Sequence, residues 1–132
     1  MLIHFPIALV AIGFLAECIS LIAKRELTLS KMSFYLLIAG TFFAVFTWLS
    51  GVLFTSEMSG AAGEIKDTHE LFAGLTLGLL LLTSLLRIIL IRNATNKLMI
   101  RLSFITYALA AICVAVTGFY GGTLVYSYMM PL

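Results

Sequence analysis

Four long apolar segments dominate this chain and leave little choice of fold. They cover residues 5–23, 33–55, 70–91 and 102–122. A helix needs roughly 20 mostly apolar residues to cross a bilayer, and each segment meets that requirement. Hydrophobic residues make up 62% of the chain and charged residues 11%. A water-soluble domain of this size cannot bury so much apolar surface. We therefore predict an all-α integral membrane protein in which residues 1–132 form a single four-helix transmembrane domain.

The charges between the segments predict the orientation of the helices. Seven of the eight Lys and Arg residues lie in or beside the first and third connections. The second connection carries Glu57, Glu64 and Asp67 against one cation, Lys66. Basic connections stay in the cytoplasm, and short connections make neighbouring helices antiparallel. We predict an up-down-up-down bundle in the bacterial inner membrane, with both termini in the periplasm.

The chain has two histidines, His4 and His69, and the predicted topology places both at the periplasmic face. Pro6 is typical of the first turn of a helix. Asp67 and Glu70 form a D-x-x-E capping pattern, which predicts that His69 lies in the first turn of the third helix. The positive end of a helix disfavours a charged imidazole. We expect both rings to be neutral, which is the form that binds a metal.

Small residues lie one and two turns beneath each histidine, so a slot between the first and third helices is expected. A flat macrocycle fits such a slot, with one imidazole on each side of its iron. The favoured cofactor is haem b, with His4 and His69 as the metal ligands. Lys66 or Tyr126 is expected to bind a haem propionate. The residues expected to line the slot are the small ones and two flanking aromatics: Ala8, Ala11, Ala73, Thr76, Phe5 and Phe72.

Other interpretations of the histidines stay open at this stage. Each can be a polar residue at the membrane surface, with small residues that only let helices approach closely. A zinc site would need carboxylates such as Glu64 or Asp67, because no cysteine lies at that depth. The chain has no CxxCH motif, so covalent attachment of haem is excluded.

Glu17 is a carboxylate inside the first apolar segment. An intramembrane carboxylate costs about 3 kcal/mol unless it is paired or protonated. Arg87 lies at a similar depth in the third segment, so we predict an ion pair between the two. The alternative is a proton relay or a quinone site at Glu17.

Two end motifs carry a resemblance to a known family. HFPIAL at residues 4–9 and GGTLVY at residues 121–126 resemble the opening and closing motifs of the bacterial family known as domain of unknown function 2231. His69 with Leu71 resembles its third motif, and Gly51 fits as well. The resemblance covers nearly the whole chain. It implies a four-helix inner-membrane protein, and the association of some members with c-type cytochromes implies a place in respiratory electron transfer.

Together these observations predict a small membrane-bound b-type cytochrome subunit of a larger respiratory or photosynthetic complex. Iron with two axial histidines has no open position for a substrate, so electron transfer is favoured over catalysis. The expected partners are membrane lipid and other membrane subunits or a c-type cytochrome, in a homo- or hetero-oligomer. The charge of +2 gives no reason to expect nucleic acid. The alternative is a cofactor-free structural subunit that docks a redox partner.

Overall fold

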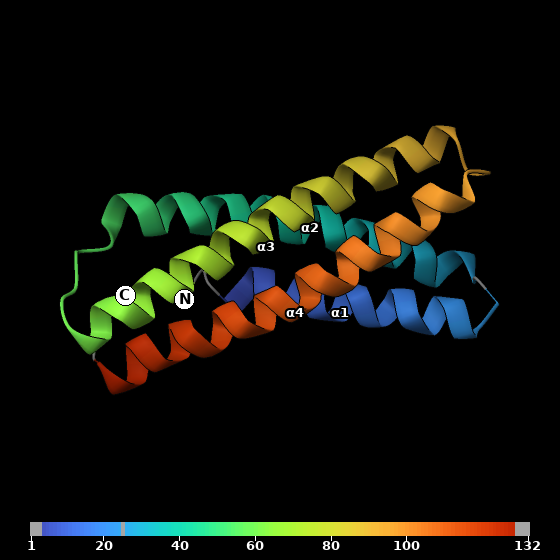
Figure 1. Cartoon of the computed structure of the whole chain (residues 1–132). Coiled ribbons are helices and arrows are strands. Elements are labelled where there is room, and N and C mark those ends of the chain that lie inside the picture. Colours follow the sequence, from blue (N-terminus) through green and yellow to red (C-terminus); the bar gives the residue numbers. More distant parts are fainter. Residues whose placement is uncertain (1–3, 25, 129–132) are drawn as a thin grey trace.

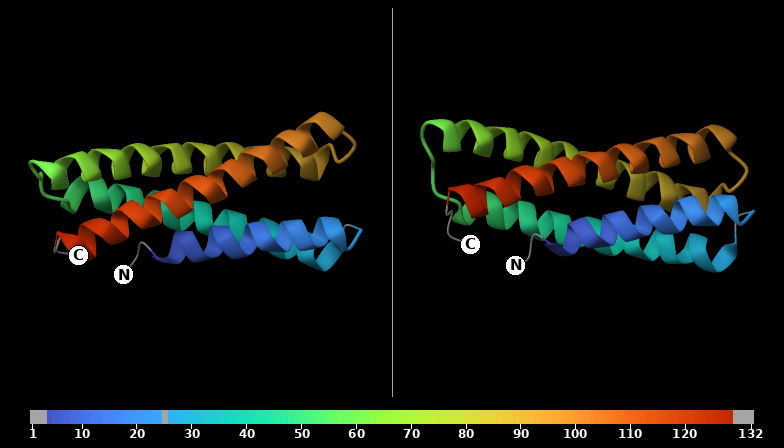
Figure 2. Two further views of the ribbon diagram at one scale, coloured as in Figure 1. Left: turned by 60° about the horizontal axis from the view of Figure 1, so that its bottom comes forward. Right: turned by 90° about the horizontal axis from the view of Figure 1, so that it is seen from below.

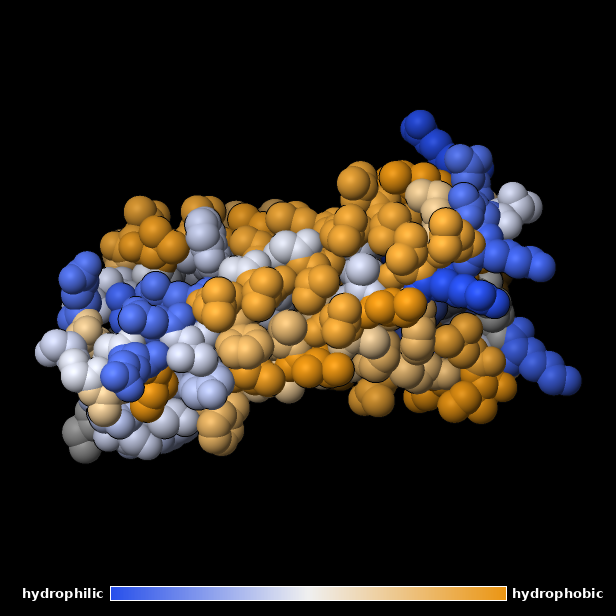
Figure 3. Space-filling model, in the orientation of Figure 1, coloured by the Kyte–Doolittle hydropathy of each residue, from blue (hydrophilic) through white to orange (hydrophobic). Residues whose placement is uncertain are grey.

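The computed structural model describes residues 4–24 and 26–128. It contains four helices: α1 (His4–Ile22), α2 (Leu27–Phe54), α3 (Ala61–Arg92) and α4 (Lys97–Ser127). Each helix is long and apolar enough to cross a membrane. Figure 3 shows a broad apolar band across the middle of the visible face, with polar residues gathered at its two ends. These features confirm the predicted all-α, four-helix membrane protein.

The bundle is built from two helical hairpins, α1–α2 and α3–α4 (Figure 1). Contacts are dense within each hairpin and sparser between them, where α2 meets α3 and α1 meets α4. The two hairpins cross at an angle (Figure 2). We call the end that carries the α2–α3 connection the histidine end. The end that carries the α1–α2 and α3–α4 connections is called the basic end.

The first and third helices lie at opposite corners of the bundle. Within the described residues, no Cα atom of α1 lies within 8 Å of one in α3. In an up-down-up-down bundle each helix packs beside its sequence neighbours, and α4 closes the ring against α1. This arrangement corrects the expectation that the first and third helices face each other across a narrow slot.

The third helix begins earlier than its sequence pattern suggests. It starts at Ala61 after Gly60, whose φ of 70° lies in the left-handed region that glycine adopts readily. His69 therefore lies two turns inside α3, and the predicted cap formed by Asp67 and Glu70 is wrong. Residues 61–68 continue the helix outward, whereas α1 has 19 residues and begins at His4. How much of each helix lies within the bilayer stays a prediction.

Small and hydroxyl side chains dominate the helix contacts. Gly40 lets α2 approach α1 so closely that an added Cβ atom would lie 3.0 Å from Val10. Hydroxyl pairs join neighbouring helices, with Thr41 Oγ1 lying 2.9 Å from Ser84 Oγ. Such contacts are typical of helix association in lipid, where apolar side chains gain little by leaving the bilayer. The apolar core between them consists of Val10, Leu37, Ala44, Leu80, Tyr107, Ala110 and Val114.

Candidate functional site

His69 is half-buried on the face of α3 that packs against α4. Its Nδ1 atom lies 3.0 Å from the backbone carbonyl oxygen of Thr117. A carbonyl oxygen only accepts hydrogen bonds, so Nδ1 must carry the proton and donate it. The remaining nitrogen, Nε2, then keeps its lone pair. A histidine that ligates a metal through one ring nitrogen commonly donates the N–H of its other ring nitrogen to a backbone carbonyl.

Gly121 makes room for the imidazole ring of His69. A Cβ atom added at Gly121 would lie 3.0 Å from His69 Cε1 and 3.3 Å from Nδ1. Even the smallest side chain at this position would press on the ring. The first glycine of the closing motif is thereby explained by its contact with the histidine of α3. The sequence pattern did not predict this contact between Gly121 and His69.

The residues that follow His69 along α3 also face α4. Phe72 stacks on Tyr120 with ring centroids 6.3 Å apart. Thr76 is buried, and its hydroxyl donates to the backbone carbonyl of Phe72. The same hydroxyl lies 3.4 Å from the hydroxyl of Thr117. Ala73 is half-buried on the same helix. Thr76 and Phe72 thus belong to the interface of the second hairpin, not to a slot facing α1.

The matching residues of α1 lie elsewhere. His4, Ala8 and Ala11 are all exposed, so no other helix of the bundle covers this stripe. Phe5 stacks on Phe43 of α2, with ring centroids 5.5 Å apart. The predicted lining of a shared slot is therefore corrected: Phe5 packs on α2 and Phe72 packs on α4. The assignment of the two histidines as metal ligands stays a prediction.

The first turn of α1 also meets α4 directly. A Cβ atom at Gly118 would lie 3.1 Å from Ile7 Cδ1, and Pro6 is buried. Ile7 belongs to the opening motif, so this motif packs α1 onto α4 three residues before Gly121. The opening motif thus contacts α4 about one turn before the closing motif begins.

The two residues expected at haem propionates are placed differently from each other. Lys66 Nζ forms an ion pair with Glu70 Oε1 at 3.1 Å, one turn along the same helix. Tyr126 is 83% exposed near the end of α4. For zinc, no three His, Cys, Asp or Glu side chains gather as a metal site within residues 4–24 and 26–128.

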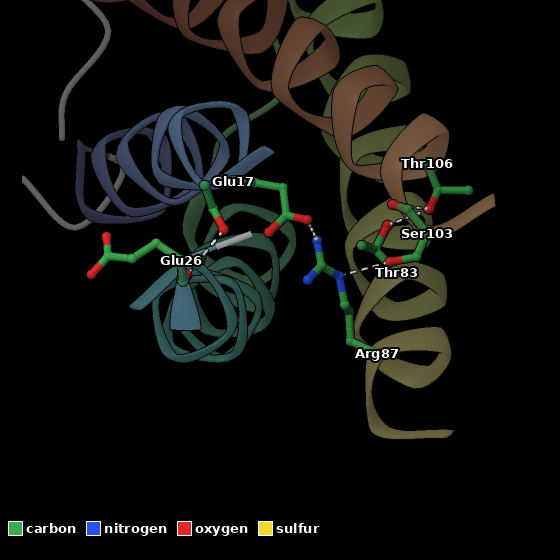
Figure 4. Close-up of polar contacts among 7 residues, drawn as sticks. Glu17, Glu26, Thr83, Arg87, Ser103 and Thr106 are labelled. Carbon is green, nitrogen blue, oxygen red and sulfur yellow. Dashed lines mark hydrogen bonds and ion pairs between the residues drawn. The ribbon is translucent and has the colours of Figure 1, made fainter. Parts of the chain in front are cut away.

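A second polar cluster lies toward the basic end, inside the membrane-spanning part of the bundle. Arg87 of α3 reaches across to Glu17 of α1, with Nη2 2.7 Å from Oε1, and the two side chains are only 13% and 12% exposed. Arg87 Nε also donates to Ser103 Oγ of α4 at 2.8 Å. Figure 4 shows Arg87 extending between the two hairpins. The predicted ion pair is confirmed.

Three buried polar atoms near this ion pair lack a partner within the described part of the chain. They are Glu17 Oε2, Ser33 Oγ and the Tyr107 hydroxyl. Ser33 and Tyr107 are both fully buried. The Tyr107 hydroxyl packs on Gly13 and lies within electrostatic reach of Arg87 and Glu17. Groups from all four helices therefore meet in one polar region.

Comparison with known proteins agrees with this architecture. The family model described as "Predicted membrane protein (DUF2231)" matches residues 1–131. No curated protein and no solved structure matches the chain. The match covers both end motifs and all four helices, so the chain belongs to the DUF2231 family of predicted membrane proteins.

Proposed function

We propose that this protein is a small b-type cytochrome subunit that carries electrons through one haem at the histidine end. The observation that carries the proposal is the orientation of His69. Its Nδ1 donates to the carbonyl of Thr117, so Nε2 is the nitrogen available to ligate iron. The bundle supplies this orientation through backbone geometry and the space left by Gly121.

His4 is the proposed second axial ligand. It begins α1, and its exposed position makes the ring accessible. His4 and His69 belong to different hairpins, so a group held by both must span the seam between the hairpins. Haem b with two histidine ligands supplies one-electron transfer without an open position for a substrate. Lys66 and Tyr126 are proposed to contact the propionates, with Lys66 shared between Glu70 and the haem.

The proposed setting is the bacterial inner membrane, with the basic end in the cytoplasm. The histidine end then faces the periplasm, where a c-type cytochrome or a larger respiratory or photosynthetic complex would exchange electrons with the haem. The apolar exterior of the helices would contact lipid and other membrane subunits. This assignment follows the loop charges.

A pyridine haemochrome assay on protein purified from haem-sufficient cells tests the proposal. We expect about one haem b per chain, the content that one pair of axial histidines can hold, and its loss in both His4→Ala and His69→Ala. Thr68→Ala is the matched control, because the Thr68 hydroxyl bonds only within α3, to the carbonyl of Glu64. Wild-type protein without a Soret band would refute the cytochrome assignment.

The second candidate is a cofactor-free structural subunit that docks a redox partner. One observation favours it: the ring of His69 already has a hydrogen-bond acceptor in Thr117 and a packing surface in Gly121. On this alternative His69→Ala lowers stability through lost packing, while His4→Ala leaves both stability and spectrum unchanged. The two single variants therefore separate the two functions.

A further inference from the structure

Two adjoining hollows lie at the basic end, where α4 begins. One, of about 550 Å³, is lined by Ala94, Thr95, Lys97, Ile100 and Arg101. The other, of about 280 Å³, is lined by Leu21, Ile100, Arg101, Phe104 and Ile105. Both include Ile100 and Arg101, so the two hollows adjoin at these two residues.

The first hollow is cationic. Lys97 and Arg101 lie four residues apart on α4 and therefore share one helix face. Within the described residues, neither has a carboxylate within salt-bridge distance. Two amide groups at the start of α4 are already used, because Asn96 Oδ1 accepts from the backbone N–H of Leu98 and Met99. An anion in this hollow would therefore be attracted mainly by the two side-chain cations.

The second hollow is apolar and lies between the hairpins. It runs from Arg101 toward Ile105 along α4 and is bounded by Leu21 of α1. Phe104 packs on Phe14 with ring centroids 5.6 Å apart and limits the depth of the groove. The contact between α1 and α4 is sparse, and this groove is a place where the two helices leave space between them.

A cationic hollow that continues into an apolar groove matches an amphiphile with an anionic head. We propose that an anionic phospholipid occupies this site, with its phosphate between Lys97 and Arg101 and an acyl chain in the groove along Leu21 and Phe104. Basic pockets between transmembrane helices bind such headgroups elsewhere, and the inner leaflet supplies the lipid. The site lies at the end opposite the histidines and is independent of the proposed haem.

The test is native mass spectrometry of the purified full chain, titrated with phosphatidylglycerol or with phosphatidylcholine of the same acyl chains. We expect retained phosphatidylglycerol, and about a 30-fold loss of its affinity in Lys97→Gln/Arg101→Gln, since each surface cation contributes about 1 kcal/mol. The control is Lys24→Gln/Arg92→Gln, which removes the same charge from the same end outside the hollows. Its affinity should fall less than about threefold, because neither side chain lines the hollows and salt screens exposed charges that do not contact the phosphate.

Three outcomes would overturn the proposal. The first is equal retention of the two lipids by the unaltered chain. The second is an equal loss of affinity in the control variant, which would show a diffuse charge effect. The third is retention of inorganic phosphate by the unaltered chain as strong as its retention of phosphatidylglycerol, which would show an anion site without a lipid chain.

Discussion

Replacing one partner of the buried ion pair should destabilise the bundle far more than replacing both. Glu17 and Arg87 are 2.7 Å apart and nearly buried. Removing one partner of such a pair leaves the other charge without compensation, at a cost of about 3–5 kcal/mol. Replacing both with apolar residues of similar volume is often neutral. We expect Glu17→Met and Arg87→Met to be destabilising singly and the double variant to recover most of the loss.

The two single variants should differ in how much they lower the free energy of unfolding. A guanidinium cannot lose its proton in a protein, whereas an isolated buried carboxyl group can take one up. Glu17→Met should therefore cost about 4 kcal/mol, near the middle of the range for a broken buried pair. Arg87→Met should cost about 2–3 kcal/mol, since the remaining carboxyl group is neutralised while the hydrogen bond to Ser103 is lost. The double variant should lie within about 1 kcal/mol of the unaltered chain.

The assay is reversible unfolding in mixed micelles of mild detergent and sodium dodecyl sulfate, analysed as a double-mutant cycle. The losses expected above correspond to a coupling energy of about 5 kcal/mol, larger than for most contacting pairs, and a coupling above about 2 kcal/mol would support the reasoning. Additive losses, with coupling below about 0.5 kcal/mol as for independent sites, would refute it. They would mean that the ion pair contributes nothing across the seam between the hairpins.

Three further predictions use the same unfolding assay. Gly121→Val should lower stability by about 1–3 kcal/mol through overpacking against His69; Gly122→Val, where nothing lies within 4 Å of an added Cβ atom, should cost less than half as much. Tyr107→Phe removes a buried hydroxyl that faces Ser33 but makes no hydrogen bond of normal geometry within the described part of the chain, so stability should be unchanged or higher; a clear loss would reveal a bond to Ser33 or to a bound water. Thr83→Val removes a 2.8 Å hydroxyl–hydroxyl bond to α4 and should cost about 0.6–1.7 kcal/mol, the range for such bonds in membrane bundles.

The overall fold could be predicted from the sequence because a long apolar segment has few stable backbone conformations in lipid. Backbone groups must be satisfied within the segment, so each one becomes a helix. The same reasoning predicted the pairing of Glu17 with Arg87, since a lone charge at that depth is costly. Both predictions rest on large free-energy costs, one for unsatisfied backbone groups in lipid and one for an unpaired charge there. The residues that incur these costs can be identified in a single sequence.

The details of the histidine end were harder to predict because they depend on weak preferences. Residues 61–68 are polar enough to resemble a loop, yet alanine, glutamate and lysine are good helix formers, and the helix extends through them to Gly60. The partner of His69 is a backbone carbonyl, which leaves no trace in the side-chain pattern. A signal did exist in Gly121, a glycine at the matching depth of the neighbouring helix.

The seam between the hairpins links the two ends of the molecule. The seam is closed by Ile7 on Gly118 at the histidine end and by Glu17 on Arg87 toward the basic end. Packing is dense within each hairpin and sparser between the hairpins, so we expect the two hairpins to move relative to each other more readily than the helices within one hairpin. A haem held by histidines of both hairpins would resist that motion, as any ligand that binds only the closed arrangement must do. The proposed lipid, seated between α1 and α4, would act on the same seam from the opposite end.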